Sequence, residues 1–296
     1  MRPADIVRLL ALSAVWGGSF IFMRVLAPVL GPILTADLRV LIAGIALVGY
    51  FAIIKFDLQW RDYWKQYLII GAFNSAIPFL CFSFAALYIP ASLSVILNST
   101  SPFFAALFSA FWLGERLSAL RVVGILVGAA GVTLVVRMGV MDGGPMVALS
   151  IIACVVATIC YGFSATYAKK FNQGAKPKGI AAASQVFAGL LLLPFVPLSP
   201  SRGEISAMIV LGVVVFALLC SAVAYLLYYR LIEDLGPTRA LTVAFLMPVF
   251  GMIWGKVILS EIISGSMIAG TAIILLGTSM VLKSGRRQPG AISVSK

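Results

Sequence analysis

Long apolar runs alternate with short polar connectors along the whole chain. No charged side chain occurs between Gln66 and Gly114, between Gly143 and Ala168, or between Ile205 and Tyr229. A helix that crosses a bilayer needs about 20 mostly apolar residues, so the first of these runs is long enough for two helices joined by a short turn. Because the runs are continuous and not divided into short alternating strands, they predict membrane-spanning helices and not a β-barrel.

This pattern predicts ten membrane spans with short connectors. The longest connectors, 54–65 and 169–178, are too short to form domains. The N-terminal residues run into the first apolar stretch without the cleavage motif of a signal peptide. The expected fold is therefore an all-α integral membrane protein with ten transmembrane helices. The spans lie near residues 5–27, 32–53, 66–88, 92–113, 120–137, 146–168, 179–199, 206–230, 239–259 and 265–283.

Composition supports a lipid environment. Of the 296 residues, 61% are hydrophobic and 11% are charged, whereas soluble domains average about 25% charged residues. The mean hydropathy is +1.08. No soluble core could hide this much apolar surface.

The distribution of lysine and arginine predicts the orientation. With the N-terminus in the cytoplasm, 17 of the 22 Lys and Arg side chains fall on the cytoplasmic side. The positive-inside rule then places both termini in the cytoplasm, and we expect a multi-pass protein of a bacterial-type plasma (inner) membrane. The net charge of +12 thus reflects membrane topology and not a nucleic-acid partner. Residues 285–296 are expected to form a disordered basic tail.

Several classes of chemistry are missing from the sequence. There is no histidine, and the four cysteines all fall inside predicted spans without metal-ligand spacing. There is also no glycine-rich phosphate loop of the kind that an ATP-driven pump needs. We therefore expect no metal, no cofactor and no enzymatic activity, since neither a nucleophile–base pair nor a metal cluster is visible.

The sequence repeats itself. An offset of 146 residues aligns Pro102 with Pro248 and Glu115 with Glu261, and an offset of 145 aligns Trp16 with Tyr161. The halves are predicted as 1–138 and 139–284, with five spans each. Because five is an odd number, the second half enters the membrane from the opposite side, and the repeats are inverted. Inverted repeats are typical of secondary transporters, whose substrate site lies near the midplane between the repeats.

Several segments carry a family resemblance across almost the whole chain. They are AVWGGSFIFMR at 14–24, DLRVLIAG at 37–44, ALYIPASLSVIL at 86–97, SPFFAALFSAFWLGERLSALRVVGILVGAAGVTLV at 101–135 and DLGPTRALTVAFLMPVFGMIWGKVILSEIISGSMIAGTAIILLG at 234–277. The pattern resembles the EamA-type exporters of the drug/metabolite transporter superfamily, and within it most resembles the YddG-like exporters of aromatic amino acids. The resemblance implies two bundles that rock around a central cavity without ATP.

A polar cluster interrupts the fourth span. Proline removes a backbone hydrogen bond, and Pro-interrupted spans at corresponding positions of two repeats point to a transporter site. Pro102 and Pro248 are therefore predicted to break helices and to contribute to gating. Asn98, Ser99 and Ser101 are predicted to face a wet central cavity. The alternative, favoured for each serine taken singly, is that the hydroxyls bond to carbonyls of their own helix.

Aromatic residues near mid-span are predicted to line the same cavity. Trp16 and Tyr161 occupy equivalent places in spans one and six, away from the interfaces that these residue types prefer. A ring with a polar tip at this depth could stack on a planar substrate, and the alternative is helix packing. The same argument adds Phe79, Tyr225, Phe245 and Met247 to the predicted wall.

Three charged residues have predicted structural roles. Arg39 is the one cation well inside a span. It either guides a substrate carboxylate at the outer mouth or locks the outer gate, and locking is favoured. Glu115 and Glu261 end spans four and nine on opposite membrane faces. Symmetry favours a shared job for them, such as holding the start of a neighbouring helix or an adjacent arginine, over proton coupling.

The sequence therefore predicts a secondary transporter that exports small metabolites as a facilitator or exchanger, with neutral or aromatic amino acids as the favoured substrates. A drug or metabolite:proton antiporter, a channel and a non-transporting membrane scaffold are the alternatives. The expected partners are a small-molecule substrate and lipid. Glycines in spans five and ten could pack within one chain or form a dimer face, which leaves a monomer and a weak homodimer open.

Overall fold

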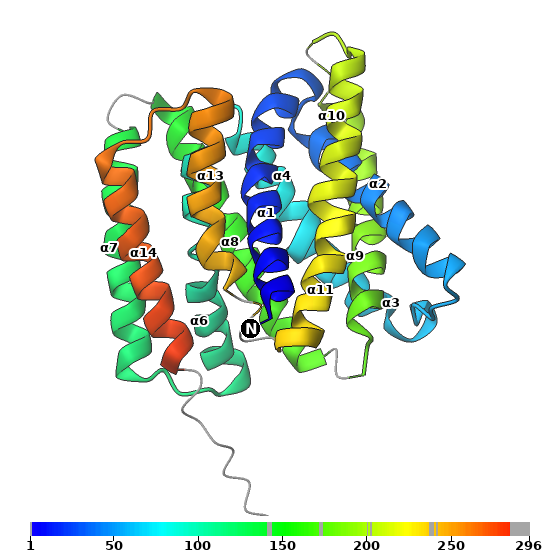
Figure 1. Ribbon diagram of the computed structural model, residues 1–296, viewed down its shortest axis with the longest axis horizontal. Helices are drawn as coiled ribbons and strands as arrows, with labels where there is room; N and C mark the ends of the chain where they lie inside the picture. The colour runs from blue at the N-terminus through cyan, green and yellow to red at the C-terminus, as the bar shows by residue number, and fades with distance from the viewer. Residues whose placement is uncertain are drawn as a thin grey trace, which may run out of the picture.

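The computed structural model describes residues 2–140, 144–171, 174–199, 201, 203–236, 240 and 242–284. The predicted basic tail, 285–296, lies outside the described residues. Every regular element in the described part is a helix, and the helices stand side by side as a bundle (Figure 1).

The first half of the chain forms five spans, three of them unbroken. These are α1 (Pro3–Leu30), α2 (Pro32–Ile53) and α7 (Ala119–Val140). The third span consists of α3 (Trp60–Gly71), the π-helical turn η1 (Ala72–Ala76) and α4 (Ile77–Ala85). The fourth consists of α5 (Ala91–Asn98) and α6 (Ser101–Leu113).

The second half also contributes five spans. Spans six, nine and ten contain α8 (Gly144–Phe171), α13 (Val243–Leu259) and α14 (Gly265–Ser284). The seventh span is α9 (Pro177–Leu192), which continues into the 3₁₀ turn η2 (Leu193–Leu198). The eighth is α10 (Ala207–Ala217), the π-helical turn η3 (Leu218–Val223) and α11 (Ala224–Leu235).

The predicted fold class is confirmed. Within the described residues, nine helical segments are long and apolar enough to cross a membrane, and α13 is a tenth, shorter apolar helix. The protein is an all-α membrane protein with two inverted five-helix repeats. The third span begins at Trp60, ahead of its predicted start at Gln66. Its first turns carry charged and aromatic residues, so a reading based on apolar runs alone omits them.

Glycines join the two repeats by close backbone contacts. A Cβ atom on Gly124 would lie 2.7 Å from the carbonyl oxygen of Gly277, and one on Gly131 would lie 2.8 Å from that of Gly270. Gly124 and Gly270 occupy equivalent positions of the two repeats, as do Gly131 and Gly277, so α7 and α14 make the same contact twice about a pseudo-two-fold axis. These glycines thus pack the two halves of one chain against each other (Figure 1).

The two predicted proline breaks differ in outcome. Pro102 is the second residue of α6, and the helix break before it separates α6 from α5. Pro248, in contrast, lies inside α13, which runs without interruption from Val243 to Leu259. The break expected at Pro248 is therefore absent from the structure. A proline removes a single helical donor, and the residue four positions earlier, Ala244, lines a cavity, so the helix can continue past it.

Two wide turns occupy equivalent positions in the repeats. The π-helical turn η1 begins at Ala72, and η3 begins at Leu218, which is the matching position of the second repeat. Such turns are rare and occur often at functional sites. Nothing in the hydropathy pattern indicates them, because each lies within an unbroken apolar run.

Candidate substrate cavity

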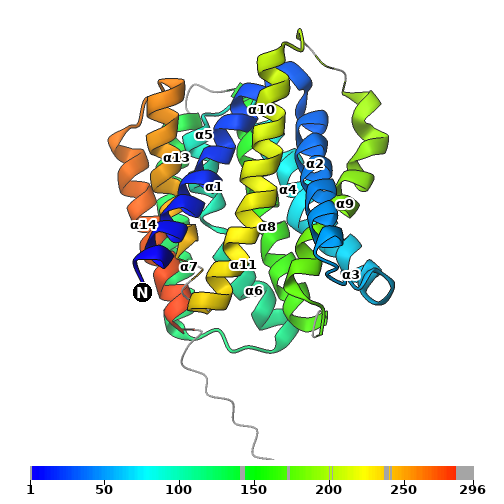
Figure 2. The same ribbon diagram turned by 45° about the vertical axis from the view of Figure 1, so that its right-hand side comes forward.

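A cavity of about 1100 Å³ lies between the two repeats. It is lined by α1, α2, α3, η1, α4, α5, α6 and α7 of the first half and by α8, α9, α11, α13 and α14 of the second. In Figure 2, α1 and α11 lie in front of α4 and α8. The side chains predicted for the wall all line this cavity, namely Trp16, Phe79, Asn98, Ser99, Ser101, Tyr161, Tyr225, Phe245 and Met247. Whether they touch a substrate stays a prediction.

Aromatic rings form one side of the cavity. The ring of Trp16 lies 5.2 Å from that of Tyr228 and 6.2 Å from that of Tyr225, measured between centroids. Elsewhere in the wall, Tyr161 of α8 stacks on Phe82 of α4 at 6.3 Å. Ring pairs at these distances pack favourably, so these rings hold one another in place, and all five line the cavity.

The serines beside the helix break bond to their own helix. The hydroxyl of Ser99 donates to the carbonyl of Val95 at 3.2 Å, and that of Ser101 donates to the carbonyl of Asn98 at 2.7 Å. These bonds are the alternative that the sequence favoured for each serine. The side-chain oxygen Oδ1 of Asn98 is different, because it is buried at the cavity wall without a hydrogen-bond partner.

The wall contains a second asparagine, Asn74, that was not predicted. Asn74 lies in η1, lines the cavity, and donates from Nδ2 to the Tyr225 hydroxyl at 3.5 Å. The signal was available, since Asn74 and Asn98 are the two asparagines inside the long charge-free run. A polar amide inside a membrane span is costly and points to a functional site, and this holds for Asn74 as it does for Asn98.

Arg39 lies in the wall of this cavity, in contact with residues of the other repeat. Only 4% of the residue is exposed. Its Nε donates to the hydroxyl of Ser221 at 3.0 Å, and its guanidinium lies 3.7 Å from the ring centre of Phe79 and 4.7 Å from that of Phe216. The bond to Ser221 joins α2 to η3, as a locking residue would, but Nη1 has no partner.

A neutral counterpart of this contact exists in the other half. Gln185 of α9 donates from Nε2 to the hydroxyl of Ser75 in η1 at 2.9 Å. The offset that aligns Pro102 with Pro248 also aligns Arg39 with Gln185, and Ser75 with Ser221. Each π-helical turn therefore presents a serine to the second span of the opposite repeat.

The cavity lining reaches charged helix ends on one side of the described bundle, which we call the open end. Glu115, Lys169 and Lys283 line it there. Glu115 accepts hydrogen bonds from Lys169 at 2.6 Å and from Arg121 at 3.0 Å. The hydrogen bond from Lys169 is the largest cause of a lowered pKa for the Glu115 carboxyl, with Arg121 adding to it.

The opposite, closed end is held by Glu261. Its carboxylate accepts from the backbone N–H of Ala91 at 2.7 Å, from that of Ser92 at 3.0 Å, and from the Ser92 hydroxyl at 2.5 Å. These bonds cap the start of α5. Apolar side chains from α1, α5 and the turn between α4 and α5 pack beside it, among them Leu30 and Ile89.

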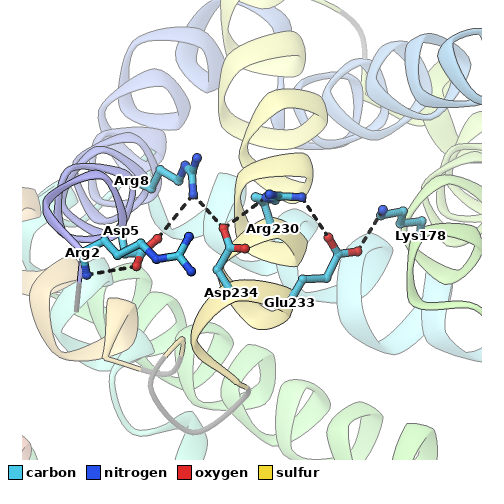
Figure 3. A network of polar contacts seen from close by, with 7 residues as sticks. All are labelled: Arg2, Asp5, Arg8, Lys178, Arg230, Glu233 and Asp234. Atoms are coloured by element: carbon cyan, nitrogen blue, oxygen red, sulfur yellow. Dashed lines mark hydrogen bonds and ion pairs between the residues drawn. The ribbon is translucent and has the colours of Figure 1, made fainter.

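A chain of ion pairs fixes one rim of the open end (Figure 3). It links α1 to α11 and α11 to the start of α9. Arg8 pairs with Asp234 at 2.7 Å, Arg230 pairs with both Asp234 and Glu233, and Glu233 pairs with Lys178 at 2.9 Å. Exposed pairs contribute about 0–1 kcal/mol each, so the network positions these helix ends more than it stabilises the fold.

The described residues hold no cluster of three or more His, Cys, Asp or Glu side chains that could bind a metal ion.

Two stretches, 5–137 and 148–283, match the model of the EamA-like transporter family. The chain belongs to the EamA-like transporter family. Each match covers one repeat.

Relatives across the family have transporter names. The chain is 26% identical to an "Uncharacterized transporter" of Archaeoglobus fulgidus, over 90% of this chain and 95% of that protein. It is 24% identical to the "Probable amino-acid metabolite efflux pump" of Salmonella typhimurium, over 90% and 91%. A solved crystal structure shares the fold with a TM-score of 0.66 at 19% identity, covering 97% of this chain and 99% of the other. The protein is thus a multi-pass membrane transporter of small molecules.

Proposed function

We propose that this family member exports neutral or aromatic amino acids from the cytoplasm by alternating access and without ATP. The observation that carries the proposal is the cavity wall, which combines aromatic side chains with unpaired polar atoms. Trp16, Tyr225 and Tyr228 offer a surface for a planar side chain. The unpaired Oδ1 of Asn98 offers an acceptor for an ammonium group. A mostly apolar pocket with a few placed polar groups is the usual form of a small-molecule site.

We infer the direction of transport from the end at which the cavity opens. The open end carries Lys169, Lys283 and the ion-paired helix ends with Arg8, Arg230 and Lys178. Short loops rich in Lys and Arg face the cytoplasm, so we assign the open end to the cytoplasm, in a bacterial-type inner membrane. A cavity open to the cytoplasm is the state in which an exporter loads its substrate.

The distribution of acids favours a facilitator or exchanger. Glu115 is the one acidic side chain that lines the cavity in the described part of the chain, and it lies at the mouth in two ion pairs. Proton-coupled carriers usually place an ionisable acid in the pathway inside the membrane. Substrate flow down its own gradient needs no such group.

Counterflow in proteoliposomes tests the proposal. Vesicles containing the purified protein are loaded with unlabelled neutral or aromatic amino acids, and entry of labelled amino acid is measured with and without a pH gradient. We expect saturable exchange that ignores pH. No exchange with any amino acid would refute the substrate class, and flux that follows the proton gradient would show the antiporter instead. Flux without saturation or counterflow would show a channel.

Two variants locate the site in the same assay. Asn98→Ala and Trp16→Ala should each lower the apparent affinity about tenfold, since each removes a group that faces the cavity. Thr133→Ala is the matched control, because the Thr133 hydroxyl bonds to the Ala129 carbonyl on the exposed face of α7. If all three variants exchanged substrate with the same apparent affinity, the site would lie elsewhere.

A further inference from the structure

We propose that the guanidinium of Arg39 binds the carboxylate of the transported molecule, so that the protein selects free acids over their amides and amines. The inference rests on the proposed function in taking an amino acid as the substrate. It goes further by naming the group of the substrate that is recognised and the residue that recognises it. Four features of the described residues support it.

No carboxylate of the described residues pairs with the charge of Arg39. None of the ion pairs among the described residues includes Arg39, and its Nη1 lacks any acceptor. A buried charge without a counter-charge is costly, and ionisable residues inside a membrane usually mark a substrate pathway. A carboxylate in the cavity would supply both the counter-charge and the missing acceptor.

The guanidinium is held in a fixed orientation. Ser221 accepts from Nε, and the rings of Phe79 and Phe216 lie within 3.7 Å and 4.7 Å of the guanidinium carbon. The hydrogen bond uses Nε and the rings lie over the guanidinium carbon, so none of these contacts uses the Nη hydrogens, which are left for a ligand. An arginine fork binds a carboxylate through two parallel hydrogen bonds, and orientation in advance lowers the cost of binding.

The other repeat shows that the structural contact needs no charge. Gln185 makes the equivalent bond to Ser75 with a neutral amide, and Gln185 is fully buried and does not line the cavity. Joining the second span to a π-helical turn is therefore possible without a cation. The positive charge at position 39, which does line the cavity, is left with a separate role.

The acid nearest in sequence does not neutralise Arg39. Asp37 is two residues away, which is about 200° around an α-helix, and it does not line the cavity. Its Oδ1 is buried without a hydrogen-bond partner. The two charges therefore lie on different faces of α2, and only Arg39 faces the space that a substrate would enter.

Binding of four related probes tests the inference on the full-length protein in detergent. The probes are phenylalanine, phenylalaninamide, 3-phenylpropanoate and 2-phenylethylamine, measured by calorimetry. They share a phenyl ring and differ in the presence of the carboxylate and the amine. We expect phenylalanine and 3-phenylpropanoate to bind at least tenfold more tightly than phenylalaninamide and 2-phenylethylamine. Equal binding of acid and amide, or no binding of either acid, would overturn the inference.

Variants then assign the preference to Arg39. Arg39→Gln should weaken both acids at least tenfold and leave the amide unchanged, and Gln185 shows that this side chain fits a contact of this kind. Arg39→Lys should keep part of the preference, because it retains the charge and loses the fork. If Arg39 had only a structural role, Arg39→Gln would weaken binding of the acids and of the amide by the same factor. That result would refute the proposal. If Arg39→Gln fails to fold, the ratio of acid affinity to amide affinity, compared between wild type and Arg39→Lys, still decides between the two roles.

The outcome separates this inference from the proposed function. If 3-phenylpropanoate binds in a manner that depends on Arg39 and phenylalanine does not bind, amino acids are the wrong substrates and the carboxylate site stands. If phenylalanine is exchanged in proteoliposomes and Arg39→Gln leaves the acid-to-amide ratio unchanged, the transport function stands and the carboxylate site fails.

Discussion

Glu261 and Glu115 occupy the same place in the two repeats and have different partners. Glu261 binds backbone N–H groups at the start of α5 and so ties the second repeat to the first. Glu115 binds two side-chain cations, Arg121 and Lys169, at the mouth of the cavity. The first arrangement closes one end of the molecule, and the second leaves the other end open.

The difference does not arise locally. Each glutamate follows a helix that ends in a left-handed residue, Gly114 with φ 70° and Ser260 with φ 56°. Each also donates its backbone N–H to the residue six positions earlier, Ser109 or Gly255. Two identical helix ends therefore present the same side chain, and the packing of the two repeats decides what that side chain meets. In an inverted-repeat transporter, such asymmetry distinguishes the open side from the closed side.

Removing the carboxylate at the closed end should have the largest effect. Glu261→Ala leaves two N–H groups at the start of α5 without their acceptor, and an unsatisfied buried donor costs about 1–3 kcal/mol. We expect a lower unfolding temperature in detergent and faster labelling of a cysteine introduced at Ile89, which is 1% exposed. Glu261→Gln keeps an acceptor and should lie between wild type and Glu261→Ala. Unchanged labelling in Glu261→Ala would show that the bonds do not close this end.

A small substitution beside Glu261 should produce a related effect. A Cβ atom on Gly255 would lie 2.6 Å from Oε2 of Glu261, so Gly255→Ala must displace the carboxylate that caps α5. We expect labelling at position 89 to rise by a smaller factor than in Glu261→Ala. Ser109→Ala, at the equivalent position of the first repeat, is the control and should leave labelling unchanged.

The contact between α7 and α14 should respond symmetrically, unlike the two ends. Gly124→Ala and Gly270→Ala change equivalent positions, and each new methyl group would meet the backbone carbonyl of the partner helix at 2.7 Å and 2.9 Å. Overpacking of this kind costs about 1–3 kcal/mol. We expect the two variants to lower the unfolding temperature to a similar extent. A large difference between them would show that the pseudo-symmetry of the backbone does not extend to energetics.

Changing Glu115 should have the smallest effect. Its ion pairs are partly exposed, with 63% of the Lys169 side chain accessible, and exposed pairs contribute little. Glu115→Gln should therefore lower the unfolding temperature less than Glu261→Gln does. A larger loss than in Glu261→Gln would reverse the comparison between the two ends.

The pH dependence of the Glu115 pairs has a definite sign. The pKa of Glu115 is lower in the folded protein than its ordinary value. The stabilisation is therefore complete above the ordinary pKa and is lost only as the pH falls through the lower, folded value. Exchange by wild type and by Glu115→Gln should have the same pH profile between about pH 5.5 and 8. A profile that flattens in Glu115→Gln would assign Glu115 to proton coupling.

Much of the fold followed from composition and periodicity. A span must bury its backbone polar groups in helical hydrogen bonds, so continuous apolar runs left one architecture for residues 3–283. The alignment of one half of the sequence on the other then predicted two inverted repeats. The depth of Trp16, Asn98 and Tyr161 along their spans follows from the same reasoning, and these residues line the cavity.

Other features depend on how the repeats meet. The same proline chemistry breaks span four before Pro102 and leaves α13 intact at Pro248. The π-helical turns lie in runs whose hydropathy is uniform, and of the two serines that they present, Ser221 faces Arg39 and Ser75 faces Gln185. A local pattern sets which groups are available. Only the packing of one repeat against the other decides which of them find a partner and which remain free to bind a ligand, because the contacts that satisfy them come from the other half of the chain.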